Sequence, residues 1–87
     1  MRFPHIRKVQ TIRTKRHKQL VEALIAERKK AGIRQIPLAK KLKRSQTWIA
    51  RIESGERRID VIEFLELAEA IGFDAQAMIA MLLRTKK

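Results

Sequence analysis

The sequence predicts an all-α fold, one compact domain of five short helices. Apolar residues recur at three- and four-residue spacing along most of the chain, as in amphipathic helices. Helix caps and helix-ending glycines divide it into short segments. The caps are Ser45, Asp60 and Asp74, and the helix-ending glycines are Gly32, Gly55 and Gly72. No segment alternates apolar and polar residues as a strand does, and 87 residues fit one domain.

The N-terminal 14 residues are basic and poorly patterned for a helix. Residues 1–18 contain seven Lys or Arg and no acidic residue, and Pro4 interrupts the few apolar residues. We expect residues 1–14 to form a basic arm that becomes ordered on binding a partner. The helical domain should span residues 15–84, and residues 85–87 should form a frayed tail.

The first helix is expected over residues 15–31. Its apolar stripe consists of Leu20, Val21, Leu24 and Ile25. The basic run at 28–30 suits the negative end of the helix dipole, and Gly32 suits a left-handed cap.

A proline constrains the second helix, which we expect within residues 34–43. Proline is tolerated only in the first helical turn, because the N–H that it lacks would have no intrahelical partner there. Pro37 therefore places the start of the helix near Gln35 and makes the helix short. The inward-facing residues are Leu38, Ala39 and Leu42.

Ser45 is expected to cap a third helix that runs to about Ser54, where Gly55 ends it. Ile49 and Ile52 supply its buried face. Together with the second helix and a tight turn, it forms a two-helix unit over about residues 35–54, of the kind that places a helix in a DNA groove.

The opposite face of this third helix carries Gln46, Thr47 and Arg51, at 100° of rotation per residue. A glutamine can bond adenine at N6 and N7, and an arginine can bond guanine at O6 and N7. A threonine methyl can contact the thymine methyl. This face therefore has the chemistry to read base edges; the alternative is an ordinary solvated face.

Two residues border the buried face of the third helix. Glu53 is an acid in a basic segment, and Arg28 in the last turn of the first helix is its best partner. We predict an Arg28–Glu53 ion pair with charge-assisted hydrogen bonds. Trp48 either packs against the second helix or contacts the sugar-phosphate wall or a thymine methyl of a duplex.

The last two helices begin at acidic caps. Asp60 and Glu63 have capping-box spacing, and Asp74 should cap a fifth helix through about Leu83. The apolar sets are Val61, Phe64, Leu65, Ala68 and Ile71 in the fourth helix, and Met78, Ile79, Leu82 and Leu83 in the fifth. Either core packing or a dimer surface explains the apolar excess at this end, formed by Phe73, Met78, Met81 and Leu82.

The net charge of +12 is segregated along the chain. Residues 19–59 contain eleven Lys or Arg against four acids, whereas residues 60–87 contain three against five. This separation favours a polyanionic partner over a merely soluble basic surface.

Several classes of function are not supported. The chain has no cysteine, and His5 and His17 lack ligands at metal spacing. Neither a phosphate loop nor a nucleophile–base pair is evident, so we expect no enzyme, metal, cofactor or small-molecule ligand. The sequence contains no apolar run of membrane length and no signal-peptide core, so a cytoplasmic, nucleoid-associated protein is expected.

The segment "GIRQIPLAKKLKRSQTWIARIESGERR" resembles the helix-turn-helix of the phage-repressor (Cro and cI) family, also called the xenobiotic-response-element family. The resemblance covers about residues 20–83 in register. It implies a lambda-repressor-like fold of five helices that binds double-stranded DNA, usually as a homodimer. Lys43 departs from the family's turn glycine and must adopt a strained or left-handed conformation; Pro37 departs from the usual helix former.

The resemblance also implies roles for individual residues. Gln46, Thr47 and Arg51 occupy base-contacting positions, and Gln35 resembles a phosphate-bonding residue. The family's Arg–Glu pair maps onto Arg28 and Glu53.

We therefore interpret the chain as a sequence-specific regulator of transcription. Phosphate contacts are expected from Trp48 and from the basic residues Lys40, Lys41, Lys43, Arg44, Arg57 and Arg58. The arm either enters the minor groove through Arg2, Arg7 or Arg13 or remains a solvated tail. The alternatives are an antitoxin-like protein-binding module that regulates its own gene, and a non-specific nucleoid or RNA-binding protein.

Overall fold

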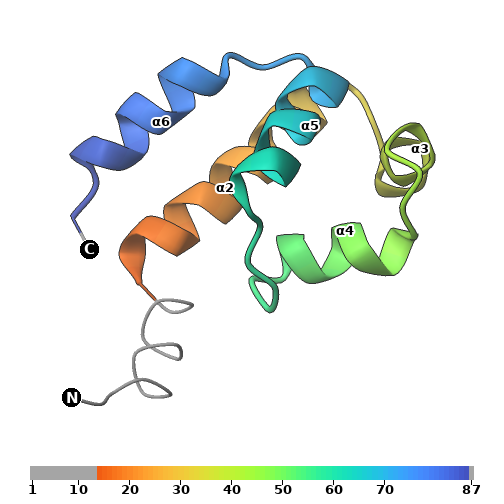
Figure 1. The fold of residues 1–87 in the computed structure, drawn as a ribbon, viewed down its shortest axis with the longest axis horizontal. Coiled ribbons are helices and arrows are strands. Elements are labelled where there is room, and N and C mark those ends of the chain that lie inside the picture. The colour runs from red at the N-terminus through yellow and green to blue at the C-terminus, as the bar shows by residue number, and fades with distance from the viewer. Residues whose placement is uncertain (1–13, 87) are drawn as a thin grey trace.

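The computed structural model describes residues 14–86, which form five helices and no strand (Figure 1). The helices are α2 (Lys15–Lys30), α3 (Gln35–Lys41), α4 (Gln46–Glu53), α5 (Val61–Ile71) and α6 (Ala75–Arg84). The all-helical fold class and the order of the elements are confirmed. The predicted arm lies outside the described residues, except for Thr14.

Side-chain caps begin the helices where the sequence places them. Ser45 accepts a hydrogen bond from the backbone N–H of Trp48, and Asp74 accepts one from that of Ala77. Asp60 and Glu63 form a complete capping box. These bonds satisfy amides that have no partner within the helix, so the starts of α4, α5 and α6 are determined locally.

The helix α3 is short for the reasons expected. Pro37 is its third residue, within the first turn. The helix ends at Lys41, two residues before the predicted end, because Lys43 is left-handed with φ of 58°. The amide of Arg44 donates to the Ala39 carbonyl and that of Lys43 to the Lys40 carbonyl, which is the Schellman pattern. The predicted left-handed Lys43 is confirmed.

The core joins the α3–α4 unit to the other helices. Leu38 of α3 and Ile49 of α4 are its largest fully buried side chains. They belong to one cluster with Leu24, Phe64 and Leu67 from α2 and α5. Burial of such side chains contributes roughly 1.5–3 kcal/mol each, and it holds α4 by its Ile49 side.

The predicted apolar sets of the last two helices are partly wrong. Val61 and Leu83 are 72% and 70% exposed, and Leu65 and Ile79 are also exposed. In α5, Leu67 and Ala70 are buried instead. Because α5 is apolar on most of its circumference, periodicity alone cannot select the face that the core uses.

The residues predicted for a dimer surface lie elsewhere than expected. Met78 is buried in the core, and Phe73, Met81 and Leu82 pack against it. Core packing, the alternative reading of the sequence, explains these four residues. The exposed apolar surface at this end is formed by their neighbours on α5 and α6.

Replacing Lys43 with glycine should stabilise the domain. A left-handed conformation destabilises a non-glycine residue by roughly 1–2 kcal/mol, and glycine avoids this strain. Glycine also loses more conformational entropy on folding, which offsets about 0.5–1 kcal/mol of the gain. We expect the K43G variant to be about 0.5–1 kcal/mol more stable to urea at pH 7. The K43A variant loses the same charge but still has a Cβ atom. If K43A gained as much stability as K43G, backbone strain at this position would not be the cause.

Candidate nucleic-acid interface

The helix α4 presents the three predicted base-reading side chains to solvent. Gln46, Thr47 and Arg51 are exposed, whereas Ile49 and Ile52 on the other side of the helix are buried. The Ser45 cap and the left-handed Gly55 delimit the helix. An eight-residue helix is marginal by itself, so packing maintains this arrangement.

The predicted Arg28–Glu53 ion pair is present and buried. Arg28 Nε donates to Glu53 Oε2 at 2.6 Å, and Nη2 donates to Oε1 at 3.0 Å. Its Nη1 donates to the Ile33 carbonyl at 2.8 Å. Such bidentate pairs fix direction as well as distance, so the pair joins the end of α2 to the end of α4 and to the loop before α3.

Gln35 links this ion pair to the exposed face. Its Nε2 donates to Glu53 Oε1 at 2.8 Å, and its Oε1 accepts from Gln46 Nε2 at 3.3 Å. The residue expected to bond a phosphate thus lies beside Gln46, the first residue of α4 that is predicted to read a base.

A second ionic cluster surrounds Trp48, which is half-buried. The guanidinium groups of Arg44 and Arg57 lie 4.5 Å and 5.3 Å from the centre of its ring. Arg57 also forms two hydrogen bonds with Glu63, at 2.9 and 3.0 Å. Arg44 lies 3.8 Å from both Glu63 and Glu66. Sequence reasoning missed this cluster, because no local spacing signals contacts between α5 and the segments on either side of α4.

The remaining cations predicted to contact phosphate divide into two groups. Lys40, Lys43 and Arg58 are exposed. Lys41 Nζ instead donates to the Ala70 carbonyl at 2.8 Å, in the last turn of α5, where a cation suits the helix dipole. The predicted arm residues Arg2, Arg7 and Arg13 lie outside the described residues.

Comparison with known proteins agrees with this geometry. The family model described as Helix-turn-helix matches residues 24–77, which include α3 and α4. A solved structure, an XRE-family like protein from Pseudomonas syringae pv. tomato str. DC3000, is 38% identical to this chain with a TM-score of 0.78. That match covers 87% of this chain and 93% of the other. No curated protein matches.

The chain belongs to the XRE-type (Cro/cI-type) helix-turn-helix family. It is therefore a DNA-binding domain of the kind found in transcription regulators. In this family the segment from α3 to α4 is the helix-turn-helix, and α4 is its recognition helix.

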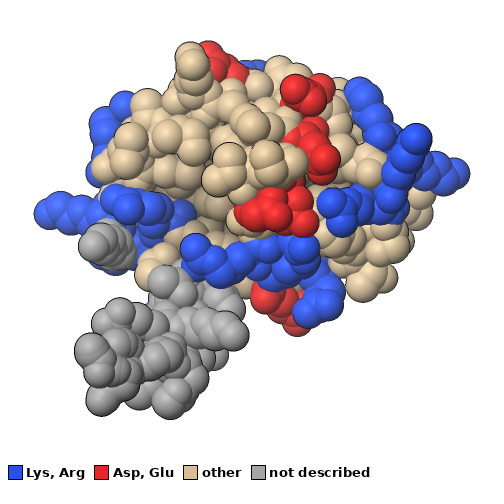
Figure 2. Space-filling model, viewed as in Figure 1, with Lys and Arg blue, Asp and Glu red and all other residues tan. Residues whose placement is uncertain are grey.

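Charge on the visible surface of this helix-turn-helix domain is segregated. On the visible face, Lys and Arg gather over α3 and α4, along the lower edge and at the left beside α6 (Figure 2). A band of Asp and Glu runs between the group over α3 and α4 and a largely uncharged region over α5 and α6. A basic surface around the recognition helix is what attraction of a phosphate backbone requires.

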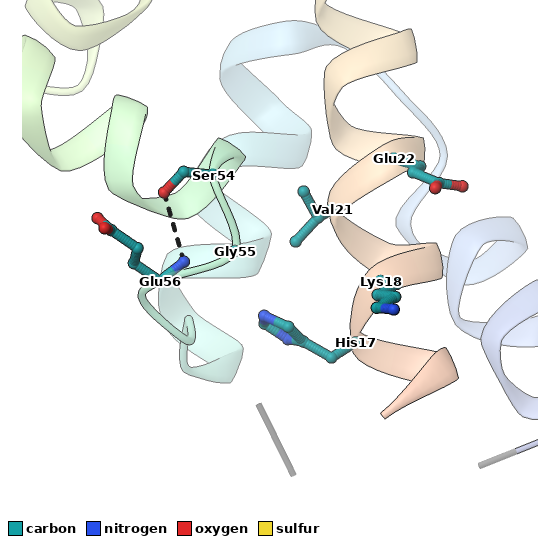
Figure 3. Close-up of a pocket in the computed structure, with 7 residues that line it drawn as sticks. All are labelled: His17, Lys18, Val21, Glu22, Ser54, Gly55 and Glu56. Carbon is teal, nitrogen blue, oxygen red and sulfur yellow. Dashed lines mark hydrogen bonds between the residues drawn. The ribbon is translucent and has the colours of Figure 1, made fainter. Parts of the chain in front are cut away.

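A cavity of about 410 Å³ lies away from the exposed face of the recognition helix, between α2 and the loop after α4 (Figure 3). His17 and Val21 point toward the loop at Gly55 and Glu56. His17 is buried, and its Nε2 has no hydrogen-bond partner within residues 14–86. In residues 14–86, no three His, Cys, Asp or Glu side chains gather as metal ligands. No helix in this range is long and apolar enough to cross a membrane.

The Arg57–Glu63 pair changes the ionisation of both groups. The hydrogen bonds from Arg57 lower the pKa of Glu63, against the opposing effect of burial, and the Asp60 backbone N–H lowers it further. The hydrogen bond to Glu63 likewise raises the pKa of Arg57. Because the folded pKa of Glu63 is depressed, its stabilising effect is present above the unfolded pKa of about 4.3 and is lost as pH falls through the folded value.

The E63Q variant should therefore be less stable than the parent at pH 7, by about 1–3 kcal/mol, because charge-assisted bonds to Arg57 are lost. The difference in unfolding free energy between E63Q and the parent should be smaller at pH 3 than at pH 7. The matched control is E66Q, since Glu66 is exposed and lies 3.8 Å from its cation; it should change stability by less than about 0.5 kcal/mol. Equal stability of E63Q and parent at pH 7 would contradict the structural role of Glu63.

Proposed function

We propose that this XRE-type domain is a sequence-specific transcription regulator that places α4 in the major groove of double-stranded DNA. The observation that carries the proposal is the division of α4 into two faces. Ile49 and Ile52 fix one face in the core, and Gln46, Thr47 and Arg51 are exposed on the other. Because the buried face prevents rotation, the same three side chains always face the groove. DNA as the partner also implies that the protein acts in the cytoplasm, at the bacterial or phage nucleoid.

Affinity in this proposal comes mainly from phosphate contacts around α4. The exposed cations Lys40, Lys43, Arg44 and Arg58 release counterions when they meet the backbone, which makes binding steeply salt-dependent. Gln35 has a second amide hydrogen for a phosphate oxygen, beside the one that bonds Glu53. We leave Lys41 and Arg57 out of this set, because each is already bonded to α5. Trp48 contributes by holding Arg44 against its ring.

The arm belongs to the same proposal through Arg2, Arg7 and Arg13. Arms of this kind enter the minor groove beside the helix that reads the major groove. A chain that starts at residue 15 would then bind DNA more weakly and with a smaller salt slope than the full chain, and equal values for the two would remove the arm from the interface.

In vitro selection of bound duplexes tests the function directly. The selected site should be bound roughly 10³-fold more tightly than random duplex at the same salt concentration. A ratio near one would instead favour the non-specific nucleoid or RNA-binding reading.

The R51A variant should lose preference at one base-pair position of the selected site. Among the described residues, the Arg51 guanidinium forms an ion pair only with Glu56, at 3.8 Å, and both side chains are more than half exposed, so Arg51 is available for a base. Loss of a bidentate contact should cost about 1–3 kcal/mol at that position alone. Titration against duplexes that carry each base pair at each position measures this effect.

The matched control for Arg51 is Arg58, an exposed cation outside the recognition helix. R58A should weaken binding to all sequences about equally and reduce the salt slope by about one. If R51A behaves in the same way as R58A, Arg51 contacts a phosphate rather than a base.

The proposed regulator is a homodimer that associates through an apolar groove between α5 and α6. The cavity there measures about 360 Å³ and is lined by Val61, Phe64, Leu65, Ala75, Gln76, Ile79, Ala80 and Leu83. Four of these side chains are large, apolar and exposed, and exposed patches of this type mark interaction sites. Dimers of this fold read half-sites about one helical turn, ~34 Å, apart.

The L83E variant should abolish the dimer, since Leu83 lies in the groove and is 70% exposed. Sedimentation at micromolar concentration, with and without the selected duplex, measures the association. The control is I62E, because Ile62 is similarly exposed on α5 but does not line the groove; it should remain dimeric. A monomeric parent chain under both conditions would end the dimer proposal.

A further inference from the structure

Four side chains from three helices form one continuous chain of hydrogen bonds that ends at the exposed face of α4. Arg28 of α2 donates twice to Glu53 of α4. Gln35 of α3 donates to the same carboxylate at 2.8 Å, and Gln46 of α4 donates to Gln35 at 3.3 Å. The chain thus runs from a buried ion pair to an exposed amide.

The direction of each bond follows from the chemistry of the first acceptor. An ionised carboxylate only accepts hydrogen bonds, so the amide of Gln35 must turn its NH₂ group toward Glu53. Its carbonyl oxygen then faces Gln46, whose amide must in turn offer its NH₂ group. If the amide group of Gln46 alone were flipped, its carbonyl oxygen would face the carbonyl oxygen of Gln35. If the amide group of Gln35 alone were flipped, its carbonyl oxygen would face the carboxylate of Glu53. Every reversal therefore loses at least one hydrogen bond.

The fixed direction leaves a defined pattern at the end of the chain. Gln46 is exposed, and its Oε1 and its second amide hydrogen have no partner among the described residues. One acceptor beside one donor matches the major-groove edge of adenine, which offers N6–H₂ and N7. Guanine offers two acceptors, O6 and N7, and so cannot satisfy the free carbonyl oxygen.

We propose that Glu53 is a positioning residue for base recognition: acting through Gln35, it fixes the amide of Gln46 in the orientation that selects adenine over guanine. This inference rests on the proposed function, since it needs α4 in the major groove. Thr47 and Arg51 are not part of the chain, so the effect is confined to the single base pair that Gln46 faces.

The experiment compares the full chain and its variants on duplexes that carry each base pair at each position of the site that the parent selects. The parent should prefer A·T over G·C at one position by about fivefold or more. Q35M removes both bonding atoms of Gln35 while keeping an unbranched side chain of similar length. E53Q replaces the acceptor with an amide that can present either group. Both should reduce the preference at that position to within about twofold and leave the ratios at other positions unchanged.

The R28K variant is the matched control for E53Q. It weakens the same buried pair but leaves the carboxylate that directs Gln35, so it should keep the preference for adenine. Q35M keeps the proposal testable if E53Q does not fold, because Gln35 lies at the edge of the core and the ion pair stays intact. If Q35M binds all duplexes more weakly by the same factor, that common factor reports a lost phosphate contact of Gln35. The ratio of the affinities for A·T and G·C duplexes is independent of this factor and still tests the proposal.

Three results would overturn the inference: a preference unchanged in Q35M, one lost equally in R28K, or a parent that prefers guanine at every position. A parent that selects no sequence would refute the proposed function itself, and the two failures are therefore distinguishable.

Discussion

The position of the recognition helix depends on the buried ion pair between Arg28 and Glu53. This helix has eight residues, too few to be stable alone. Two isoleucines anchor its side, and the ion pair ties its last residue to α2 and, through the Ile33 carbonyl, to the loop that leads into α3. Removing one partner would leave a buried charge uncompensated, which typically costs about 3–5 kcal/mol. For a domain of this size, that is a large part of the total stability.

A second ionic centre supports the opposite side of the helix-turn-helix. Glu63 completes the capping box of α5 and also binds Arg57 from the loop after α4. Arg57 and Arg44 in turn lie against the ring of Trp48. One carboxylate thus caps a helix, anchors a loop and helps to hold an aromatic side chain. The buried indole N–H of Trp48 has no hydrogen-bond partner in the described part of the chain, a cost that the surrounding contacts must offset.

The features that could be predicted from the sequence are those with a local cause or a family pattern. Caps at Ser45, Asp60 and Asp74 depend on bonds within three residues, and Pro37 restricts the start of α3 through its own covalent structure. The left-handed Lys43 and the Arg28–Glu53 pair followed from the resemblance together with helix geometry.

What could not be predicted depends on how helices meet. The exposed Val61 and Leu83 and the buried Leu67 show that an almost uniformly apolar helix does not encode which side faces inward. The bond from Lys41 to the end of α5 and the Arg57–Glu63 pair join residues from different elements, and no local spacing distinguishes such cations from those left in solvent. The exposure of Gln46, Thr47 and Arg51 was easier to predict, because it follows from two buried isoleucines one turn apart.

The segregation of charge gives the molecule an electric moment. Residues 19–59 carry an excess of seven positive charges and residues 60–87 an excess of two negative ones, so the segment that contains the recognition helix is attracted to a duplex more strongly than the segment that contains α5 and α6. A field of this shape acts over about 10 Å at 0.1 M salt, before any side chain touches the duplex. Approaching molecules are thereby rotated during diffusion. The protein is thus largely oriented before it contacts the duplex. The same charges make the basic surfaces of two copies repel each other in free solution.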